Sequence, residues 1–539
     1  MQNTFIHLTI FILLSSFGKL SHGQTIADFK DISIFFGDMQ KSGSNVEDLM
    51  ITKSGELLCI QNKLSLLNFF SRNNSKYSFD FITDYKLPEI HPISFYGNGK
   101  KSSFTHYTVL GDKILGVSSQ TTYLNKKQKL YYHLIDISSQ GKSNHGFSMN
   151  EYFDFNKDTD LSKITLVTSQ DKKYASIIYT HEPSIEMYEN IGILNFKDGS
   201  ANPQSSHFTF PFPTKEYEFL DFHIKDENNQ YIVSGHFLET PAKSNWVNEV
   251  NYYKTIVIGK IANKEFNYEK IEDDGRFYTK VGFYNAGDQI ILSGLYSPFI
   301  DGNIEGVFTA TINKTGELVN KKYTPFSSDV IASIAAYNLN FLNDQNTIKN
   351  EYIGFDIVEF YSTKEGYIGI AEFNALEYKY ASADVPGATN TVDSYFWSND
   401  IIVFKLHLNG DLDWNRIIPK YQRSINDRGY YLSNATYLGS DYLHLFFNDN
   451  QLNYDQDGDY NKNGDPPFAA QFNSGKHTIG HVSLRLSDGF INRKSTIGKE
   501  ETNLLLVPLL SRSFTEKKKL MIYGRSGNRH KIGSISFRN

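Results

Sequence analysis

Hydrophobic residues occur along most of this chain in short runs rich in Ile, Val, Leu, Tyr and Phe, and polar turns rich in Gly, Asn, Asp and Lys separate these runs. Typical runs are YIVSGHF (231–237), QIILSGLY (289–296) and DYLHLFF (441–447). A helical spacing of hydrophobic positions is almost absent. Short apolar runs between turn residues are typical of β-strands, and the pattern therefore predicts an all-β protein.

The strand pattern repeats along the chain. Each unit has an apolar strand, a polar turn, a second strand, a variable insertion, a third strand rich in β-branched residues, a Gly turn and an outer strand. Eight such units begin near residues 46, 104, 164, 217, 277, 352, 430 and 503. Four strands per unit, repeated radially, predict a β-propeller. We expect eight four-stranded blades; seven blades and a row of β-sandwiches are the alternatives.

The two ends of the repeat complement each other. The last unit stops at Phe537 after three strands and lacks its outer strand. The segment ADFKDISIFF (27–36) is strand-like and belongs to none of the units. We therefore expect an N-terminal strand to complete the last blade and close the ring.

One unit carries a more specific pattern. The segment DIIVFKLHLNGDLDWNRI (400–417) resembles the repeat of the bacterial SBBP-type β-propeller proteins at Asp400, Lys405, Leu406, Gly410, Leu412 and Trp414. The position of the Trp holds Asn320 in one other unit and Arg493 in the next. The resemblance implies an extracytoplasmic propeller, in a family of mostly unassigned role.

The N-terminus predicts export. Leu8 to Phe17 form an apolar run of ten residues, which is too short to span a bilayer and has the length of a signal-peptide core. We expect residues 1–23 to be a signal peptide and 24–539 a single propeller domain without a transmembrane helix. The single cysteine, Cys59, excludes an intrachain disulfide and favours a bacterial protein. No sorting domain follows the last strand, so we expect the periplasm or peripheral attachment to the outer membrane.

The net charge and the absence of common catalytic motifs reduce the number of possible function classes. The chain has 539 residues and a net charge of −6, which argues against a nucleic-acid partner. The sequence lacks H-E-x-x-H, G-x-S-x-G, a Walker loop and G-x-G-x-x-G. These observations favour a non-catalytic protein. A pair of carboxylates for glycoside hydrolysis stays open, because its members would come from different blades and leave no local motif.

Four insertions between second and third strands are long: 239–253, 297–305, 374–399 and 448–476. In a propeller such loops emerge on one face, and aromatic residues on loops over a rigid scaffold are typical of binding sites. The candidate partner-binding residues are Trp246, Tyr252, Tyr378, Tyr380, Trp397 and Tyr454. Alternatively, these loops pack on each other and cover the ring. The same aromatic side chains would also suit a glycan ligand.

The last insertion contains a candidate Ca²⁺ site. Oxygen-bearing side chains alternate along NYDQDGDYNKNGDPP (453–467), at Asp455, Asp457, Asp459, Asn461, Asn463 and Asp465. Ca²⁺ takes six to eight oxygen ligands, which an alternating loop can supply. However, Ala470 stands where a helix–loop–helix calcium motif has its bidentate Glu. An ordinary solvated turn is the alternative.

These observations lead to three hypotheses. The first is an exported, non-catalytic propeller that acts as a protein–protein interaction scaffold or accessory subunit of a bacterial cell-envelope complex. The second is a carbohydrate-binding or glycoside-hydrolysing propeller. The third is a calcium-stabilised surface adhesin.

Overall fold

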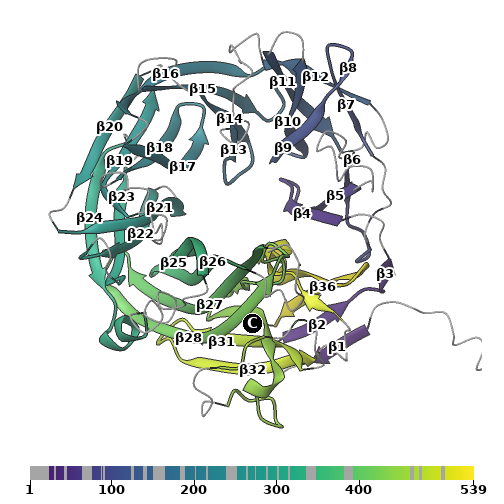
Figure 1. Ribbon diagram of the computed structural model, residues 1–539, viewed down its shortest axis with the longest axis vertical. Helices are drawn as coiled ribbons and strands as arrows, with labels where there is room; N and C mark the ends of the chain where they lie inside the picture. Colours follow the sequence, from purple (N-terminus) through teal and green to yellow (C-terminus); the bar gives the residue numbers. More distant parts are fainter. Residues whose placement is uncertain are drawn as a thin grey trace, which may run out of the picture.

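The computed structural model arranges the strands as sheets around a ring (Figure 1). It describes residues 24–28, 32–41, 45–63, 76–86, 88, 92–122, 127–137, 143–149, 164–181, 188–200, 202–213, 216–237, 252–262, 265–272, 275–286, 289–299, 303–313, 316–334, 347–380, 392–461, 467–470, 472, 476–498 and 504–538. The expected signal peptide, residues 1–23, lies outside these ranges. No helix among the described residues is long and apolar enough to cross a membrane.

The first half of the chain supplies four groups of strands. The first is β4 (Asn45–Ile51), β5 (Leu57–Lys63) and β6 (Lys76–Phe81). The second is β9 (Ser103–Leu110), β10 (Lys113–Thr122), β11 (Lys127–Asp136) and β12 (Ser143–Ser148), with β7 (Ser94–Gly97) and β8 (Lys100–Lys101). The third is β13 (Ile164–Thr168), β14 (Tyr174–His181), β15 (Tyr188–Lys197) and β16 (Gln204–Pro213). The fourth is β17 (Tyr217–Asp226), β18 (Asn229–Phe237), β19 (Tyr253–Ala262) and β20 (Glu265–Glu272).

The second half supplies four more. The fifth is β21 (Phe277–Ala286), β22 (Gln289–Ser297), β23 (Gly306–Ile312) and β24 (Leu318–Pro325). The sixth is β25 (Thr347–Ser362), β26 (Gly366–Tyr380), β27 (Val392–His407) and β28 (Leu412–Ile425). The seventh is β29 (Ala435–Leu438), β30 (Tyr442–Asn450), β31 (His477–Arg485) and β32 (Ile491–Gly498). The eighth is β33 (Leu505–Leu506), β34 (Arg512–Phe514), β35 (Lys519–Ser526) and β36 (Arg529–Phe537), with β1 (Gln24–Asp28), β2 (Ile32–Phe36) and β3 (Gln40–Lys41). Short 3₁₀ helices lie at η5 (Gln451–Asn453), η6 (Pro508–Leu510) and η7 (Thr515–Lys517).

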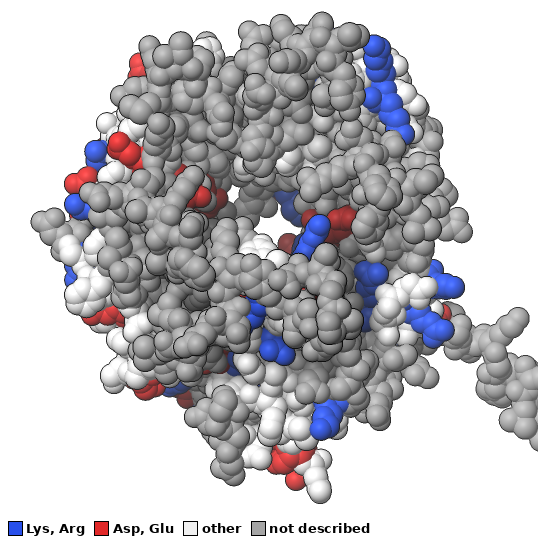
Figure 2. Space-filling model, viewed as in Figure 1, with Lys and Arg blue, Asp and Glu red and all other residues white. Residues whose placement is uncertain are grey.

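This arrangement confirms the predicted all-β propeller. The fourth and fifth groups join into one sheet through the single pair Tyr253↔Tyr278. The eight groups begin close to the eight unit starts that the sequence indicates, and eight blades stay our interpretation of this sheet pattern. Figure 2 shows that the molecule is hollowed near the centre of the ring.

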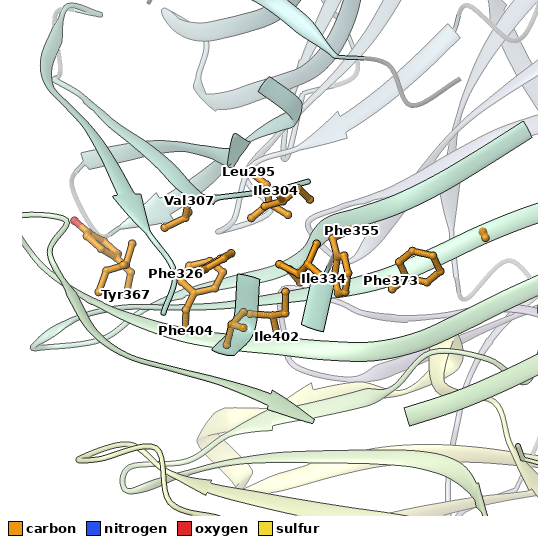
Figure 3. Packing of buried hydrophobic residues seen from close by; sticks show 14 of the residues in the cluster. Leu295, Ile304, Val307, Phe326, Ile334, Phe355, Tyr367, Phe373, Ile402 and Phe404 are labelled. Carbon is orange, nitrogen blue, oxygen red and sulfur yellow. The ribbon is translucent and has the colours of Figure 1, made fainter. Parts of the chain in front are cut away.

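The core lies between adjacent groups. Along β27, Ile402 and Phe404 face one neighbour, where they pack with Leu295, Val307 and Phe326 (Figure 3). The intervening Ile401 and Val403 pack against the other neighbour, together with Leu443, Leu445, Val482 and Leu484. A strand buried on both faces has a continuous apolar run rather than an alternating one. The sequence IIVF at 401–404 therefore marks a strand in the middle of a sheet.

The N-terminal strand closes the ring as expected. β2 pairs antiparallel with β36 from Ile32↔Phe537 to Phe36↔Gly533, and β1 pairs with β2 on the outside. Gly533 allows this approach, because a Cβ atom there would lie 2.4 Å from the carbonyl oxygen of Phe35. Figure 1 shows β2 and β36, from opposite ends of the chain, side by side.

Polar contacts also join neighbouring groups along their inner strands. Asp48 on β4 forms an ion pair with Arg512 on β34, with 2.5 Å between Oδ1 and Nη2. The Oδ2 atom of Asp221 on β17 accepts a hydrogen bond of 2.8 Å from the backbone N–H of Phe283 on β21. The first of these contacts connects the first group to the eighth, so side chains reinforce the closure that the backbone of β2 makes.

One predicted insertion differs from our expectation. The segment 374–399 was expected as a loop, but its described residues 374–380 and 392–399 are the ends of β26 and β27. They pair from Asn374↔Ser398 to Tyr380↔Val392. Five of these 15 residues are aromatic, and aromatic side chains favour a paired strand. Only 381–391, between the two strands, lie outside the described residues.

Replacement of Ile34 tests the closure. Ile34 on β2 is 1% exposed and packs in the cluster with Leu520, Ile522 and Ile535. We expect Ile34→Ala to lower the free energy of unfolding by about 2–5 kcal/mol, because it leaves a cavity in this cluster. Ser33→Ala on the other face of β2 is the control and should change it by less than about 1 kcal/mol. Urea unfolding measures both, and equal effects would contradict the assigned register.

Candidate functional site

The sheet β25–β28 is longer than the others. Its strands have 14 to 16 residues, whereas the strands of the other described groups have at most ten. At about 3.3 Å per residue, the additional residues lengthen the sheet by roughly 13–20 Å. The extension comprises the second half of β26, the first half of β27 and the end of β28. In strand length, it is the part of the described structure that differs most from the other groups.

One face of this extension carries what we call the Arg423 cluster: Glu377, Lys379, Tyr395, Trp397, Tyr421 and Arg423. Trp397 and Arg423 are directly opposite each other on β27 and β28. The guanidinium carbon of Arg423 lies 5.4 Å from the centre of the Trp397 ring and 5.8 Å from that of Tyr395. The rings of Trp397 and Tyr421 stack with 5.8 Å between their centres. Cations over aromatic faces in this range attract the rings electrostatically.

Hydrogen bonds hold the aromatic part of the cluster. The indole N–H of Trp397 donates to Oε2 of Glu377 over 2.9 Å. Lys379 Nζ lies 3.1 Å from the same oxygen. Glu377 is 1% exposed, so this buried carboxylate is both paired and hydrogen-bonded. Arg423, by contrast, is exposed, and within the described part of the chain its recorded contacts are the two rings.

A second, fully buried polar cluster lies beneath the extension. Lys420 is 0% exposed and forms an ion pair with Glu372, which is 1% exposed. Lys420 Nζ also donates to Ser398 Oγ at 2.9 Å and to Gln422 Oε1 at 3.1 Å. Burial lowers the pKa of Lys420, and Glu372 opposes this shift.

The Glu372 carboxylate joins two groups of strands. It accepts hydrogen bonds from Ser433 Oγ at 2.6 Å and from Asn434 Nδ2 at 3.1 Å, just before β29. Glu359 on β25 lies close enough for the two carboxylates to interact; burial raises the pKa of Glu359, and Glu372 adds to the shift. A carboxylate bound by a lysine, a hydroxyl and an amide is held in place, which suits a structural role better than proton transfer.

A third polar cluster lies in the seventh group. Asp449 forms a buried ion pair with Arg493 and accepts hydrogen bonds from Tyr454 Oη at 2.6 Å and Asn453 Nδ2 at 2.8 Å. The guanidinium of Arg493 also lies 3.9 Å from the centre of the Tyr460 ring. The sequence pattern places Arg493 at the position of the repeat Trp but gives it no role, and it does not predict this cluster. The only local signal is that an arginine stands where the preceding unit has Trp414.

The predicted partner-binding residues do not form one surface. Tyr378 and Tyr380 lie on β26 and Trp397 lies on the adjacent β27, but the register puts Trp397 on the opposite face of the sheet. Tyr378 is half-buried. Tyr252 is half-buried directly before β19, and Trp246 lies outside the described residues. The expectation that Trp397 and Tyr454 lie on exposed loops is wrong: they are 9% and 8% exposed, and each donates a hydrogen bond to a buried carboxylate, Glu377 or Asp449. Their contribution to partner binding stays a prediction.

The candidate calcium residues form a turn in their described part. Tyr454 and Tyr460 make an isolated bridge, and Asp455 Oδ1 accepts backbone hydrogen bonds from Asp457 at 3.0 Å and Asp459 at 2.9 Å. Asp459 Oδ1 lies 3.2 Å from Lys494 Nζ. Asn461 is exposed at the end of this turn, and Asn463 and Asp465 lie outside the described residues. No cluster of three His, Cys, Asp or Glu side chains suited to a metal occurs among the described residues. Calcium binding by this loop stays a prediction.

No family model matches the chain. No curated protein matches it either.

Solved structures with a similar fold include the WD40 domain of SCAP from fission yeast, at 9% identity and a TM-score of 0.38, covering 96% of this chain and 98% of that one. The β-propeller domain of the Trilobed protease from Pyrococcus furiosus has 9% identity and a TM-score of 0.32, covering 81% and 95%. An α-L-arabinofuranosidase of Fusarium graminearum in complex with arabinobiose has 9% identity and a TM-score of 0.27, covering 70% and 94%. These likenesses concern the fold and carry no argument about function.

A double-mutant cycle tests the buried pair. Lys420→Met and Glu372→Leu should each lower the free energy of unfolding by about 3–5 kcal/mol, because each leaves an uncompensated buried charge. The double variant should lose clearly less than the sum of the two. Urea unfolding of the four proteins gives the coupling free energy, and additive losses would show that the pair does not hold the extension.

Proposed function

We propose that this protein is an exported, non-catalytic β-propeller that serves as a protein–protein interaction scaffold or accessory subunit of a bacterial cell-envelope complex at the outer membrane. The extension of β26–β28 is its docking surface. The observation that carries this proposal is the Arg423 cluster: an exposed guanidinium held over two aromatic rings on a rigid sheet.

Arg423 has the properties of an interface hot spot. Arg, Trp and Tyr are the residues most enriched among those that dominate binding energy. A guanidinium that is already oriented loses less conformational freedom when it binds a carboxylate. Ile425, at the end of β28, is directly opposite Tyr395, is 43% exposed and offers apolar surface on the same face as Arg423. We expect the partner to present an acidic side chain to Arg423 and an apolar side chain to Ile425.

The buried clusters support a docking role because they make the extension stiff. Lys420, Glu372 and Ser433 connect β28, β26 and the segment before β29. A surface on a rigid element binds with a smaller entropy loss than a flexible loop does. We expect these buried polar residues to support the docking surface without contributing to it directly.

The envelope location rests on the sequence. The apolar run from Leu8 to Phe17 supports export, and the single Cys59 supports a bacterial exported protein. The resemblance of 400–417 to SBBP-type repeats supports the same compartment. The carboxylate of Glu372 is engaged in structural contacts with Lys420, Ser433 and Asn434. This favours the scaffold over a glycoside hydrolase that would use this carboxylate.

Affinity capture from the native cells tests this proposal. The tagged protein is extracted in mild detergent and its partners are quantified by mass spectrometry. We expect one envelope protein in a fixed ratio, and Arg423→Gln should lower its recovery by about tenfold or more. Arg529→Gln, which removes an exposed arginine at the start of β36, is the control and should leave recovery unchanged.

Two results would contradict the proposal. Recovery of the protein without a stoichiometric partner would argue against a scaffold. A partner whose recovery is the same for the wild type and Arg423→Gln would show that it docks elsewhere. A circular dichroism melt of each variant confirms that the fold is intact, as expected for exposed side chains.

A further inference from the structure

A cavity lies at the seam where the ring closes. It has a volume of about 450 Å³ and is bounded by one face of the sheet β29–β32 and by Ile32 on β2 and Phe537 on β36. This volume lies within the range of small-molecule sites, roughly 300–1,000 Å³. We call it the seam pocket. It lies apart from the Arg423 cluster, which occupies the sheet of the preceding group.

The two faces of the sheet that forms the seam pocket differ in chemistry. On one face, Leu443, Leu445, Phe447, Val482 and Leu484 pack into an apolar cluster with β26 and β27. The alternate residues of the same strands include His444, His481 and Ser483, which line the pocket. Sheets in a propeller are normally buried by apolar contacts with both neighbours. Where the seventh and eighth groups meet, the inner part of the contact is apolar and contains Tyr437, Phe446 and Ile535. The outer part of the same contact is polar.

The polar side chains of the pocket form a regular grid. His444 on β30 is directly opposite Ser483 on β31. Ser483 and His481 on β31 are opposite Asn492 and Lys494 on β32. Cross-strand neighbours on one face have Cβ atoms about 4.5–5.5 Å apart. The grid therefore presents hydroxyl, amide, imidazole and ammonium groups over an area that one sugar ring can reach.

The two histidines supply hydrogen-bonding groups, and at least His481 is neutral. His444 Nδ1 and His481 Nε2 are 3.0 Å apart, and the ring of Phe446 stacks on His481 with 4.5 Å between centres. Burial, together with His444, lowers the pKa of His481 to about 3, so that this imidazole is neutral near pH 7. A neutral imidazole offers one donor and one acceptor, which suits the hydroxyl groups of a sugar.

The residues that line the pocket include two cations, Lys494 and Arg485, and one acid, Asp441. Asp488, in the turn that follows β31, holds Arg485, whereas Lys494 is 44% exposed in its ion pair with Asp459. An exposed ion pair of this kind contributes little free energy, so a ligand carboxylate can replace Asp459 on Lys494. At the rim, the rings of Tyr442 and Phe490 are 38% and 60% exposed. Exposed aromatic faces pack against the apolar face of a sugar ring.

We propose that the seam pocket binds an acidic sugar, a hexuronic acid residue. Its carboxylate binds Lys494, its hydroxyl groups bind Ser483, Asn492 and the histidine pair, and its ring rests against Tyr442 or Phe490. This binding site is independent of the docking surface on the extension, and either can fail without the other.

Saturation-transfer NMR with the purified protein tests the proposal. D-glucuronate is the probe. D-glucose, which lacks the carboxylate, and acetate, which lacks the sugar ring, are the matched controls. We expect saturation transfer to glucuronate with a dissociation constant in the millimolar range, and at least about tenfold weaker binding of glucose and of acetate. Glucuronate binding should also weaken as salt is added.

Three variants locate the site. Lys494→Gln should weaken glucuronate binding by about tenfold. Lys197→Gln, which removes an exposed lysine from an ion pair with Glu227 on another blade, should leave it unchanged. Ser483→Phe should abolish binding by filling the pocket without removing a charge. A melting curve for each variant shows that the fold is retained.

The results that would overturn the proposal are distinct. One is the absence of saturation transfer to glucuronate from the folded wild type. Another is that glucose or acetate binds as tightly as glucuronate does, which would exclude specificity for an acidic sugar. A third is unchanged glucuronate binding in both Lys494→Gln and Ser483→Phe, which would place the ligand elsewhere.

Discussion

The pairing of β2 with β36 is the constraint on which the rest of the structure depends. Five residue pairs, from Ile32↔Phe537 to Phe36↔Gly533, join the two ends of the chain. In a ring of sheets each group needs a neighbour on both sides to bury its two apolar faces, so an open ring would expose two of them. The ion pair between Asp48 and Arg512 joins the first and eighth groups at the inner strands. Closure therefore combines backbone pairing with a side-chain contact.

At two places in the ring, buried polar clusters replace part of the apolar packing between neighbouring groups. Lys420 and Glu372 hold the extended sheet β25–β28 to the next group, and Asp449 and Arg493 hold the strand ends of that group. Buried charges are costly unless they are paired and hydrogen-bonded, and here each carboxylate has several donors. These clusters fix where the extension and its exposed Arg423 lie. The seam pocket, in turn, exists because the outer part of the closing interface is polar.

Much of this architecture could be predicted from the sequence, because strand runs and turns repeat with a recognisable unit. The closing strand at 27–36 was predicted from one missing and one spare strand, and β2 confirms it. The extension was harder to predict, because aromatic residues such as Tyr395 to Trp397 are common both in strands and in binding loops. Trp397 and Tyr454 were expected on exposed loops, yet their partners Glu377 and Asp449 come from other strands. Arg423 carries no local signal, since its role depends on two rings that reach it only across the sheet.

Native-state hydrogen exchange, read by mass spectrometry on peptides that cover 32–36 and 529–537, tests the closing interaction most directly. If β2 is an integral strand of the last blade, its amides should exchange with β36 in the slowest class, through global unfolding. Both peptides should then respond equally to added urea. Rapid exchange of 32–36 while 529–537 stays protected would contradict the account, because it would mean that the ring holds together without its N-terminal strand.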